Sequence, residues 1–435
     1  MKTVPSESGL PYLGHILPFL RNCNDLFDEM VAKHGKVYSN KYAGKHILHL
    51  MTPDANEFVL LDRGKNFSSR LAWNRTLKNL FPNGLMLRDG DDHRHHRRLL
   101  GAPFKATALK TYVDIMNPKI ERAVGSWNDG AGDFLFYKSI KELTLNLASS
   151  IFIGESLDDE AAQVNQAFVD LVDASAVVVR YPMFGNKYQR GLRSRAFLED
   201  YFRNRIPKKR QSEDTDMFAE ICRAQSDDGN HFSDQDIVDH IIFLMMAAHD
   251  TTTSSLSSVC YALSKNSEWQ DKLRAEIKKI DEDHLSYDRT GEFTSAGLVL
   301  KEALRLYPPL PVIPRRAVSD CEFDGYHILK GQQVLVSPYF TQRLPEIWSK
   351  PSTFDPDRFT KERAEDLKHK HAWIPFGGGA HKCLGLHFAE LQIKLLLFTL
   401  LKRYRISVNE GYEMPYQPAP IGKPIDLLPL KLTAV

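Results

Sequence analysis

The chain has neither a strong charge imbalance nor a long hydrophobic run. Its 435 residues carry 57 Lys and Arg against 55 Asp and Glu, a balance that gives no sign of bulk nucleic-acid binding. Near the N-terminus, the apolar stretch Ile16 to Leu20 is too short to span a membrane and ends at Arg21. We therefore expect no nucleic-acid partner, no signal peptide and no membrane anchor.

Cysteine is scarce and irregularly placed. An odd number of widely spaced cysteines argues against a disulfide framework and for a reducing compartment, so we expect a cytoplasmic protein. The five cysteines are Cys23, Cys222, Cys260, Cys321 and Cys383.

Linkers, internal repeats and low-complexity tracts are also absent from the sequence. Length alone suggests about three domains of ~150 residues, but proline, glycine and serine are scattered and nothing separates the chain into parts. The 43% of hydrophobic residues suffices for a sizeable core. The sequence therefore predicts one large, helix-rich domain over residues 1–435.

The most distinctive stretch that is present covers residues 374–389 and reads IPFGGGAHKCLGLHFA. Its three consecutive glycines allow positive φ angles and close approach to a flat ligand. Cys383 follows them, just ahead of an apolar helical pattern that runs to Lys402, and N–H groups at a helix start lower the pKa of a thiol. A thiolate in such a loop is a plausible axial ligand for haem iron.

Two other interpretations of Cys383 stay open on these residues alone. A lone cysteine at a helix start is often a small buried hydrophobic residue. His381, Cys383 and His387 could also contribute to a zinc site, although no second cluster of suitable spacing would complete four ligands.

The pattern Phe376-x-x-Gly379-x-x-x-Cys383-x-Gly385 closely resembles the haem-binding loop of the cytochrome P450 family. The resemblance implies the mainly α P450 fold with a small β-rich region. It also implies haem b (iron protoporphyrin IX) as cofactor, with Cys383 as the iron ligand and Phe376, Gly379, His381 and Gly385 beside the haem.

A second resemblance lies in the longest helical pattern, which begins at the capping box Ser233-x-x-Asp236 and ends near Lys265. Within it, residues 247–251 read AAHDT and resemble the family's small-Gly-x-acid-Thr motif, with Ala248 where glycine is usual. The added methyl group leaves less room for oxygen or for a local helix bulge. The resemblance implies that Asp250 and Thr251 relay protons to oxygen through water.

Residues 91–98, DDHRHHRR, combine acids, histidines and arginines. A charge run of this kind usually forms a solvated helix face, yet His93 and Arg97 are four apart and share one face. In the resemblance this pair, together with Arg315 and His381, contacts the haem propionates. Arg94 and Arg98 are expected at the surface.

Three further residues resemble a buried ion cluster of the family. Glu302-x-x-Arg305 would be a weak surface ion pair if it stood alone. It is followed by Tyr307-Pro308-Pro309 and later by Pro356-Asp357-Arg358-Phe359, which resemble the segments that bring Arg358 onto the Glu302–Arg305 pair. Such a cluster would fix the loop ahead of Cys383.

The substrate site is the least determined by sequence. Apolar residues from 68 to 87 lack a clean period, so we expect an irregular loop that lines a pocket, and the turn at residues 420–422 could reach the same pocket. The stretch 68–104 loosely resembles bacterial relatives that oxidise retinoids and other terpenoid or lipid chains. The expected pocket residues are Trp73, Phe81, Leu85, Phe243, Ala247, Val312 and Ile421.

Together these motifs predict a haem-thiolate monooxygenase that acts on an apolar small molecule such as a lipid, terpenoid or steroid. No flavin or iron–sulfur segment is evident, so electrons would come from a separate NAD(P)H-dependent ferredoxin reductase and ferredoxin. We expect a monomer. The alternatives are a haem-thiolate isomerase or dehydratase, and a non-catalytic haem carrier or sensor.

Overall fold

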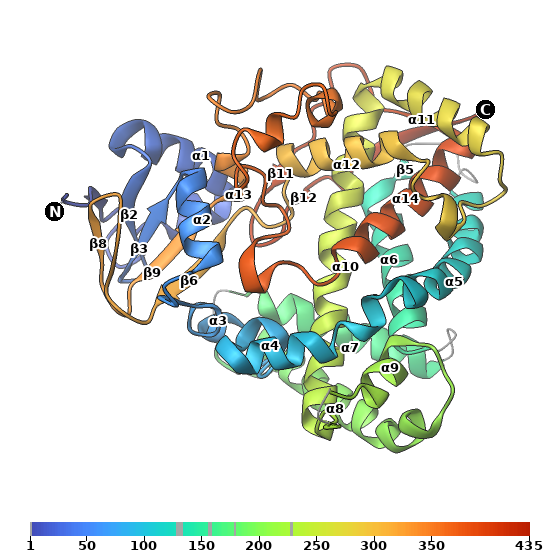
Figure 1. The fold of residues 1–435 in the computed structure, drawn as a ribbon, viewed down its shortest axis with the longest axis horizontal. Coiled ribbons are helices and arrows are strands. Elements are labelled where there is room, and N and C mark those ends of the chain that lie inside the picture. The colour runs from blue at the N-terminus through green and yellow to red at the C-terminus, as the bar shows by residue number, and fades with distance from the viewer. Residues whose placement is uncertain (1, 128–133, 155–158, 178–179, 227–228) are drawn as a thin grey trace.

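The computed structural model describes residues 2–127, 134–154, 159–177, 180–226 and 229–435. Helices dominate it, as the periodicity predicted (Figure 1). They are α1 (Ile16–His34), α2 (Pro53–Leu61), α3 (Ser69–Leu77), α4 (Gly90–Leu99), α5 (Ala106–Gly125), α6 (Phe136–Phe152), α7 (Asp159–Ser175), α8 (Lys187–Gln211), α9 (Met217–Arg223), α10 (Asp234–Lys265), α11 (Ser267–Ile280), α12 (Thr294–Leu306), α13 (Pro338–Thr341) and α14 (Leu386–Arg403).

The β-structure is small and lies mostly beside α1 and α2, at the left of Figure 1. The largest sheet has the order β1-β2-β3-β9-β6-β4. The alternating apolar and polar residues from Lys36 to Leu50, around Gly44-Lys45, predict a β-hairpin, and the structure confirms it, because Val37 pairs with Leu50 and Tyr42 with Lys45 across the turn. The strands are β1 (Ser6–Glu7), β2 (Val37–Tyr42), β3 (Lys45–Leu50), β4 (Phe67–Ser68), β5 (Phe134–Leu135), β6 (Ile313–Ala317), β7 (Cys321–Phe323), β8 (Tyr326–Ile328), β9 (Gln333–Val336), β10 (Tyr404–Ser407), β11 (Tyr416–Gln417), β12 (Lys423–Pro424) and β13 (Pro429–Ala434).

One local prediction was wrong. Residues 69–77, expected as irregular loop, form α3. The Ser68 hydroxyl caps this helix by accepting a 2.8 Å hydrogen bond from the Leu71 N–H, which satisfies one of the free donors of the first turn. The following segment is less regular, with a short 3₁₀ turn at Leu85–Leu87. The capping residue Ser68 was the sequence signal for this helix, and it was overlooked because the apolar residues of the segment show no helical period.

Helix α10 crosses the centre of the helical region, and α14 packs against α5, α10, α11 and α12 (Figure 1). The predicted cap of α10 is confirmed, since the Ser233 hydroxyl accepts from the Asp236 N–H at 3.1 Å. Among the described residues, one segment, Gly379–Arg403, is long and apolar enough to cross a membrane. It contains α14, and most of its apolar side chains are buried among those neighbouring helices.

Candidate functional site

The loop before α14 is closed by its own backbone. The Cys383 N–H donates to the Phe376 carbonyl at 2.9 Å. Gly377 and Gly379 have φ angles of 68° and 62°, in the region that favours glycine. At Gly379 a Cβ atom would also stand 1.9 Å from the Leu60 carbonyl oxygen. Glycine is therefore needed here both for conformation and for close approach to α2.

Cys383 differs from the other cysteines. It is exposed, whereas Cys321 is half-buried and Cys23, Cys222 and Cys260 are buried. Although the residue is exposed, the surrounding protein desolvates the sulfur atom and so raises the Cys383 pKa. The Gly385 N–H, Arg97 and Lys382 act in the opposite direction and only partly offset this effect. The position at a helix start predicted a lowered pKa for the Cys383 thiol, and this prediction is wrong for the protein without a bound metal ion. A bound metal ion deprotonates a coordinating thiol outright.

The zinc alternative finds no support in the described residues. They contain no group of three His, Cys, Asp or Glu side chains placed to hold a metal ion. His387 lies at the surface, 3.4 Å from the Glu390 carboxylate.

One face of α4 points toward the Cys383 loop. His93 is buried, and its ring centroid lies 3.9 Å from that of His381. Its Nε2 atom is buried without a hydrogen-bond partner in the part of the chain described. Arg97 is half-buried, whereas Arg94 and Arg98 are exposed, and Arg94 forms an ion pair with Asp91. The predicted division of this helix into two faces is confirmed.

Burial lowers the pKa of His93 to about 3, with further lowering by His381 and Arg97. It also lowers the pKa of His381, against the raising effect of Asp89, whose carboxylate lies 3.6 Å away. Both imidazoles are therefore neutral at pH 7. Four residues are expected to contact the propionates, and of these only Arg97 and Arg315 therefore carry a positive charge.

Arg315, on β6, is buried, and burial lowers its pKa to about 10. Its only hydrogen bond among the described residues goes from Nη1 to the adjacent Pro314 carbonyl, at 2.9 Å, and no described carboxylate lies within 4.0 Å of it. Arg316 is less buried and bonds the Gly331 carbonyl. The Asp89 and Asp62 carboxylates act on its charge only from farther away. A buried cation without a direct ion pair is costly, so an anionic ligand fits this position. The unpaired His93 donor, Arg97 and Arg315 together suit the two carboxylates of haem.

The second cluster, around Glu302, is complete in itself. Arg305 binds the Glu302 carboxylate with two hydrogen bonds of 2.7 and 2.9 Å. Arg358 adds a third, of 3.1 Å, and all three side chains are fully buried. The structure thus brings together the predicted trio from α12 and the segment Pro356–Phe359.

Two members of this region were missed from sequence. Glu365 accepts from Arg358 at 2.7 Å and so balances the second arginine. Gln342 donates to the Leu304 carbonyl at the end of α12 and accepts from the Ile374 N–H, both at 2.9 Å. It therefore ties the ion cluster to the start of the Cys383 loop. No motif marks either residue: the Gln342 partners are more than thirty residues away in the chain, and Glu365 follows Arg358 at a spacing of seven that the quoted segment does not include.

The middle of α10 is the part of this helix most open to its surroundings. Met246, Ala247, Ala248, Asp250 and Thr251 are half-buried, whereas residues 237–245 and 252–263 are buried. The helix continues without a break through Ala248, so no bulge forms there. Ala247 and Ala248 pack against the same core as Phe376 and Leu384 of the cysteine loop.

Asp250 and Thr251 point to different partners. The Thr251 hydroxyl donates to the Ala247 carbonyl at 2.7 Å. The Asp250 carboxylate lies 3.1 Å from His249 Nδ1 and 3.6 Å from Lys141 Nζ of α6. Burial acts to raise the Asp250 pKa, but His249 and Lys141 outweigh it and hold the pKa below its usual value.

Of the expected pocket residues, most share one apolar cluster. Phe81 and Phe243 meet edge to face at 6.5 Å between ring centroids, and Leu85, Trp73 and Ala247 belong to the same core. Val312 packs instead under α1. The turn containing Ile421 is fixed by a 2.9 Å bond from the Gly422 N–H to the Pro309 carbonyl.

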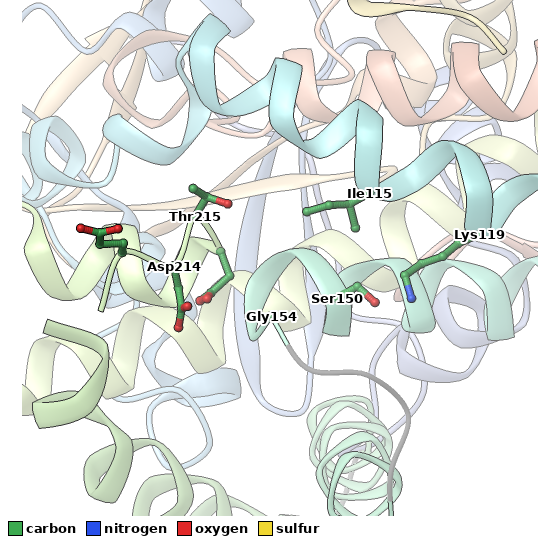
Figure 2. Close-up of a pocket in the computed structure, with 8 residues that line it drawn as sticks. Ile115, Lys119, Ser150, Gly154, Asp214 and Thr215 are labelled. Carbon is green, nitrogen blue, oxygen red and sulfur yellow. The ribbon is translucent and has the colours of Figure 1, made fainter. Parts of the chain in front are cut away.

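A separate hollow of about 430 Å³ lies between α5, the end of α6 and the segment before α9 (Figure 2). It is lined by Ile115, Lys119, Ser150, Gly154 and residues 213–216. Asp216, at its edge, already pairs with Lys209 and caps α9. None of the predicted haem or relay residues lines this hollow, so its acids serve the local fold.

The comparisons agree with this geometry. The family model for Cytochrome P450 matches residues 4–431. A cytochrome P450 136 of Mycobacterium tuberculosis is 37% identical, over 99% of this chain and 89% of its own length. A sterol 14alpha-demethylase of Mycolicibacterium vanbaalenii is 29% identical, over 95% and 93%. The solved structure of a cyanobacterial CYP120A1 with retinoic acid bound has a TM-score of 0.90 and 27% identity, and each chain is covered fully.

Proposed function

This chain belongs to the cytochrome P450 family, and from that premise we propose that Cys383 ligates the iron of its haem b. A protein of this family is an oxidoreductase, a haem-thiolate monooxygenase that binds haem b through a cysteine thiolate. The observation that carries the assignment is the combination of an exposed cysteine in a glycine loop with the unpaired His93 Nε2 and with Arg315, which forms no ion pair within 4.0 Å among the described residues.

When bound, the haem supplies the redox chemistry, and the thiolate ligand favours O–O cleavage. The chain's own residues do the rest. Arg97, Arg315 and the neutral His93 and His381 would hold the two propionates. The closed loop from Phe376 to Gly385 fixes the sulfur in position. The Glu302 cluster, through Gln342, keeps the beginning of that loop in register.

Proton delivery belongs to the open stretch of α10. The Thr251 hydroxyl already donates to the Ala247 carbonyl, so its lone pairs are free to accept a hydrogen bond from water. Asp250 faces Lys141 on the solvent side. Thr251→Ala should keep consuming NADPH while releasing hydrogen peroxide in place of product. Full coupling of NADPH to product in that variant would refute the relay.

The substrate is an apolar small molecule of the lipid, terpenoid or steroid kind. The half-buried Trp73 and Ala247 support this class, because they pack against the apolar core that contains Phe81, Leu85 and Phe243. Relatives that carry the names of a sterol demethylase and a taxane hydroxylase, and the retinoic-acid-bound structure, point to the same chemistry.

Electrons come from a separate ferredoxin and its NAD(P)H-dependent reductase. Lys382, exposed beside Cys383, and the exposed side of α4 offer cations to an acidic partner. Reduction that slows as salt rises would support this docking, and reduction indifferent to salt would contradict it. We place the protein, as a monomer, in the cytoplasm, in keeping with its five free cysteines.

The ferrous–CO spectrum tests the central assignment. The wild-type protein should show the strongly red-shifted Soret band of a thiolate ligand, and Cys383→Ala should lose it. Cys321→Ala, a matched removal of another thiol that is not fully buried, should keep the band. If Cys383→Ala retained it, another residue would be the ligand. Product that gains label from ¹⁸O₂ only with the reductase system present would separate monooxygenation from an isomerase or a haem carrier.

A further inference from the structure

Helix α10 carries a histidine that the proton relay, as proposed above, does not use. His249 precedes Asp250 and is buried. Its Nε2 lies 3.3 Å from the Lys141 carbonyl oxygen of α6. A carbonyl can only accept a hydrogen bond, so Nε2 carries the proton in this contact. The state of the other nitrogen, Nδ1, is then fixed by what it faces.

Nδ1 faces the Asp250 carboxylate, 3.1 Å from Oδ1. A bare Nδ1 beside an ionised carboxylate would set two lone-pair atoms against each other with no proton between them. One proton must therefore belong to the pair, as an imidazolium beside a carboxylate or as an imidazole beside a carboxylic acid. The low pKa of Asp250 favours the first form.

The surroundings allow this proton to move. Asp250 Oδ1 is buried, and its 3.1 Å contact with His249 Nδ1 is not a hydrogen bond of good geometry in this arrangement, so the two side chains must align before the proton passes between them. Lys141 Nζ stands 3.6 Å from the same oxygen, and its side chain is 34% exposed, which links the pair to solvent. Tyr137, also on α6, feels the Asp250 charge, and burial followed by that charge raises its pKa. Asp250, Lys141 and Tyr137 are the titratable groups around His249.

We propose that His249 is a positioning residue that holds the proton which Asp250 delivers. This rests on the proposed relay through Asp250. In the transfer the Nδ1–H bond breaks as the Oδ1–H bond forms, and the imidazolium becomes neutral while the carboxylate becomes a carboxylic acid. Asp250 then gives the proton to water on the Thr251 side. The pair regains a proton from solvent past Lys141, so no electrons are exchanged.

A spectroscopic experiment tests the protonation state without turnover. In the diamagnetic ferrous–CO complex, ¹⁵N-histidine NMR distinguishes an imidazolium, with both nitrogens protonated, from a neutral ring. His249→Gln identifies the signal, because its amide can still donate to the Lys141 carbonyl but cannot carry a transferable proton. We expect an imidazolium signal at neutral pH that becomes neutral in Asp250→Asn. A neutral wild-type ring, or an imidazolium that survives Asp250→Asn, would overturn the proposal.

Kinetics supply the second arm. His249→Gln should slow coupled turnover by less than the roughly hundredfold that a positioned proton donor usually contributes, raise the solvent deuterium isotope effect and flatten the pH profile. Combined with Asp250→Asn it should add nothing further, whereas losses that multiply would show that the two residues act independently. His387→Gln, at the surface, is the matched control and should behave as wild type. Normal turnover in Asp250→Asn beside an intact wild-type imidazolium would refute the relay and still support the proton-holding pair.

Discussion

Two polar clusters flank the Cys383 loop, and they differ in whether the protein alone completes them. Around Glu302, two buried arginines meet two glutamates and several carbonyls. Around His93, two arginines and two histidines converge with Asp89 as the one acid in contact, through His381. The first cluster is balanced in charge, and the second carries more donors than acceptors and is the one that we propose binds the haem propionates.

The difference separates structure from ligand binding. A buried ion network is stable when every member has a partner, and it mainly fixes one arrangement of the chain. A buried cation without a partner is a cost that only a ligand removes. Sequence motifs marked both groups equally, whereas the hydrogen bonds distinguish the cluster that is complete in itself from the one that we propose binds haem.

The largest effect should follow from breaking the complete cluster. Glu302→Gln leaves Arg305 and Arg358 with one carboxylate fewer in a fully buried site, and loss of one partner from such a network costs about 3–5 kcal/mol. Chemical denaturation should show a correspondingly lower free energy of unfolding, with or without haem. The control is Glu292→Gln, which removes an equally spaced but exposed pair with Arg289. Comparable losses in the two variants would mean that the Glu302 cluster is no more than another ion pair.

Removing Arg315 from the incomplete cluster should weaken haem retention in the holoprotein but should not destabilise the haem-free protein. Arg315→Ala removes a propionate partner from the holoprotein, and a charge-assisted hydrogen bond is worth about 1.5–3 kcal/mol, so haem should transfer faster to an acceptor such as apomyoglobin. In the haem-free protein the same change removes a buried cation that has only the longer-range attraction of Asp89 and Asp62, and it should not lower the unfolding midpoint. Arg316→Ala, on the neighbouring residue, should retain haem. A haem-free protein destabilised by Arg315→Ala would show that Arg315 has a structural partner after all.

Sequence patterns predicted the fold where period and caps were clear, as in α10, α12 and the β2–β3 hairpin. They failed over residues 69–77, where a single serine cap decides the helix. At the site they identified Cys383, His93 and Glu302 through fixed spacings. They could not find Gln342, whose role arises from contacts more than thirty residues away, or Glu365, which lies outside the quoted motifs. They also could not find the neutral state of the histidines, which burial imposes.

A third polar cluster extends the comparison, because its hydrogen bonds depend on the protonation of two histidines and therefore on pH. Arg88 Nη1 donates to His96 Nε2 at 2.7 Å, so this nitrogen is unprotonated and His96 Nδ1–H donates to His240 Nε2 at 2.8 Å. Asp236 and Asp92 balance Arg88. Burial lowers the pKa of His240 well below 6.5 and also lowers that of His96, with Arg88 adding to both.

The smallest expected effect is therefore a change in the slope of the unfolding free energy against pH. Because both folded pKa values are depressed, the unfolded chain binds more protons as pH falls below 6.5, and stability present above that pH is lost progressively on acidification. His240→Gln can still accept from His96 but no longer titrates, so the slope of unfolding free energy against pH should become shallower by up to about 1.4 kcal/mol per pH unit. Urea titrations between neutral and mildly acidic pH measure it, with the surface variant His387→Gln as reference. Curves for His240→Gln and wild type that stay parallel below pH 6.5 would mean that His240 is protonated in the folded protein, and the chain of neutral donors from Arg88 would then be wrong.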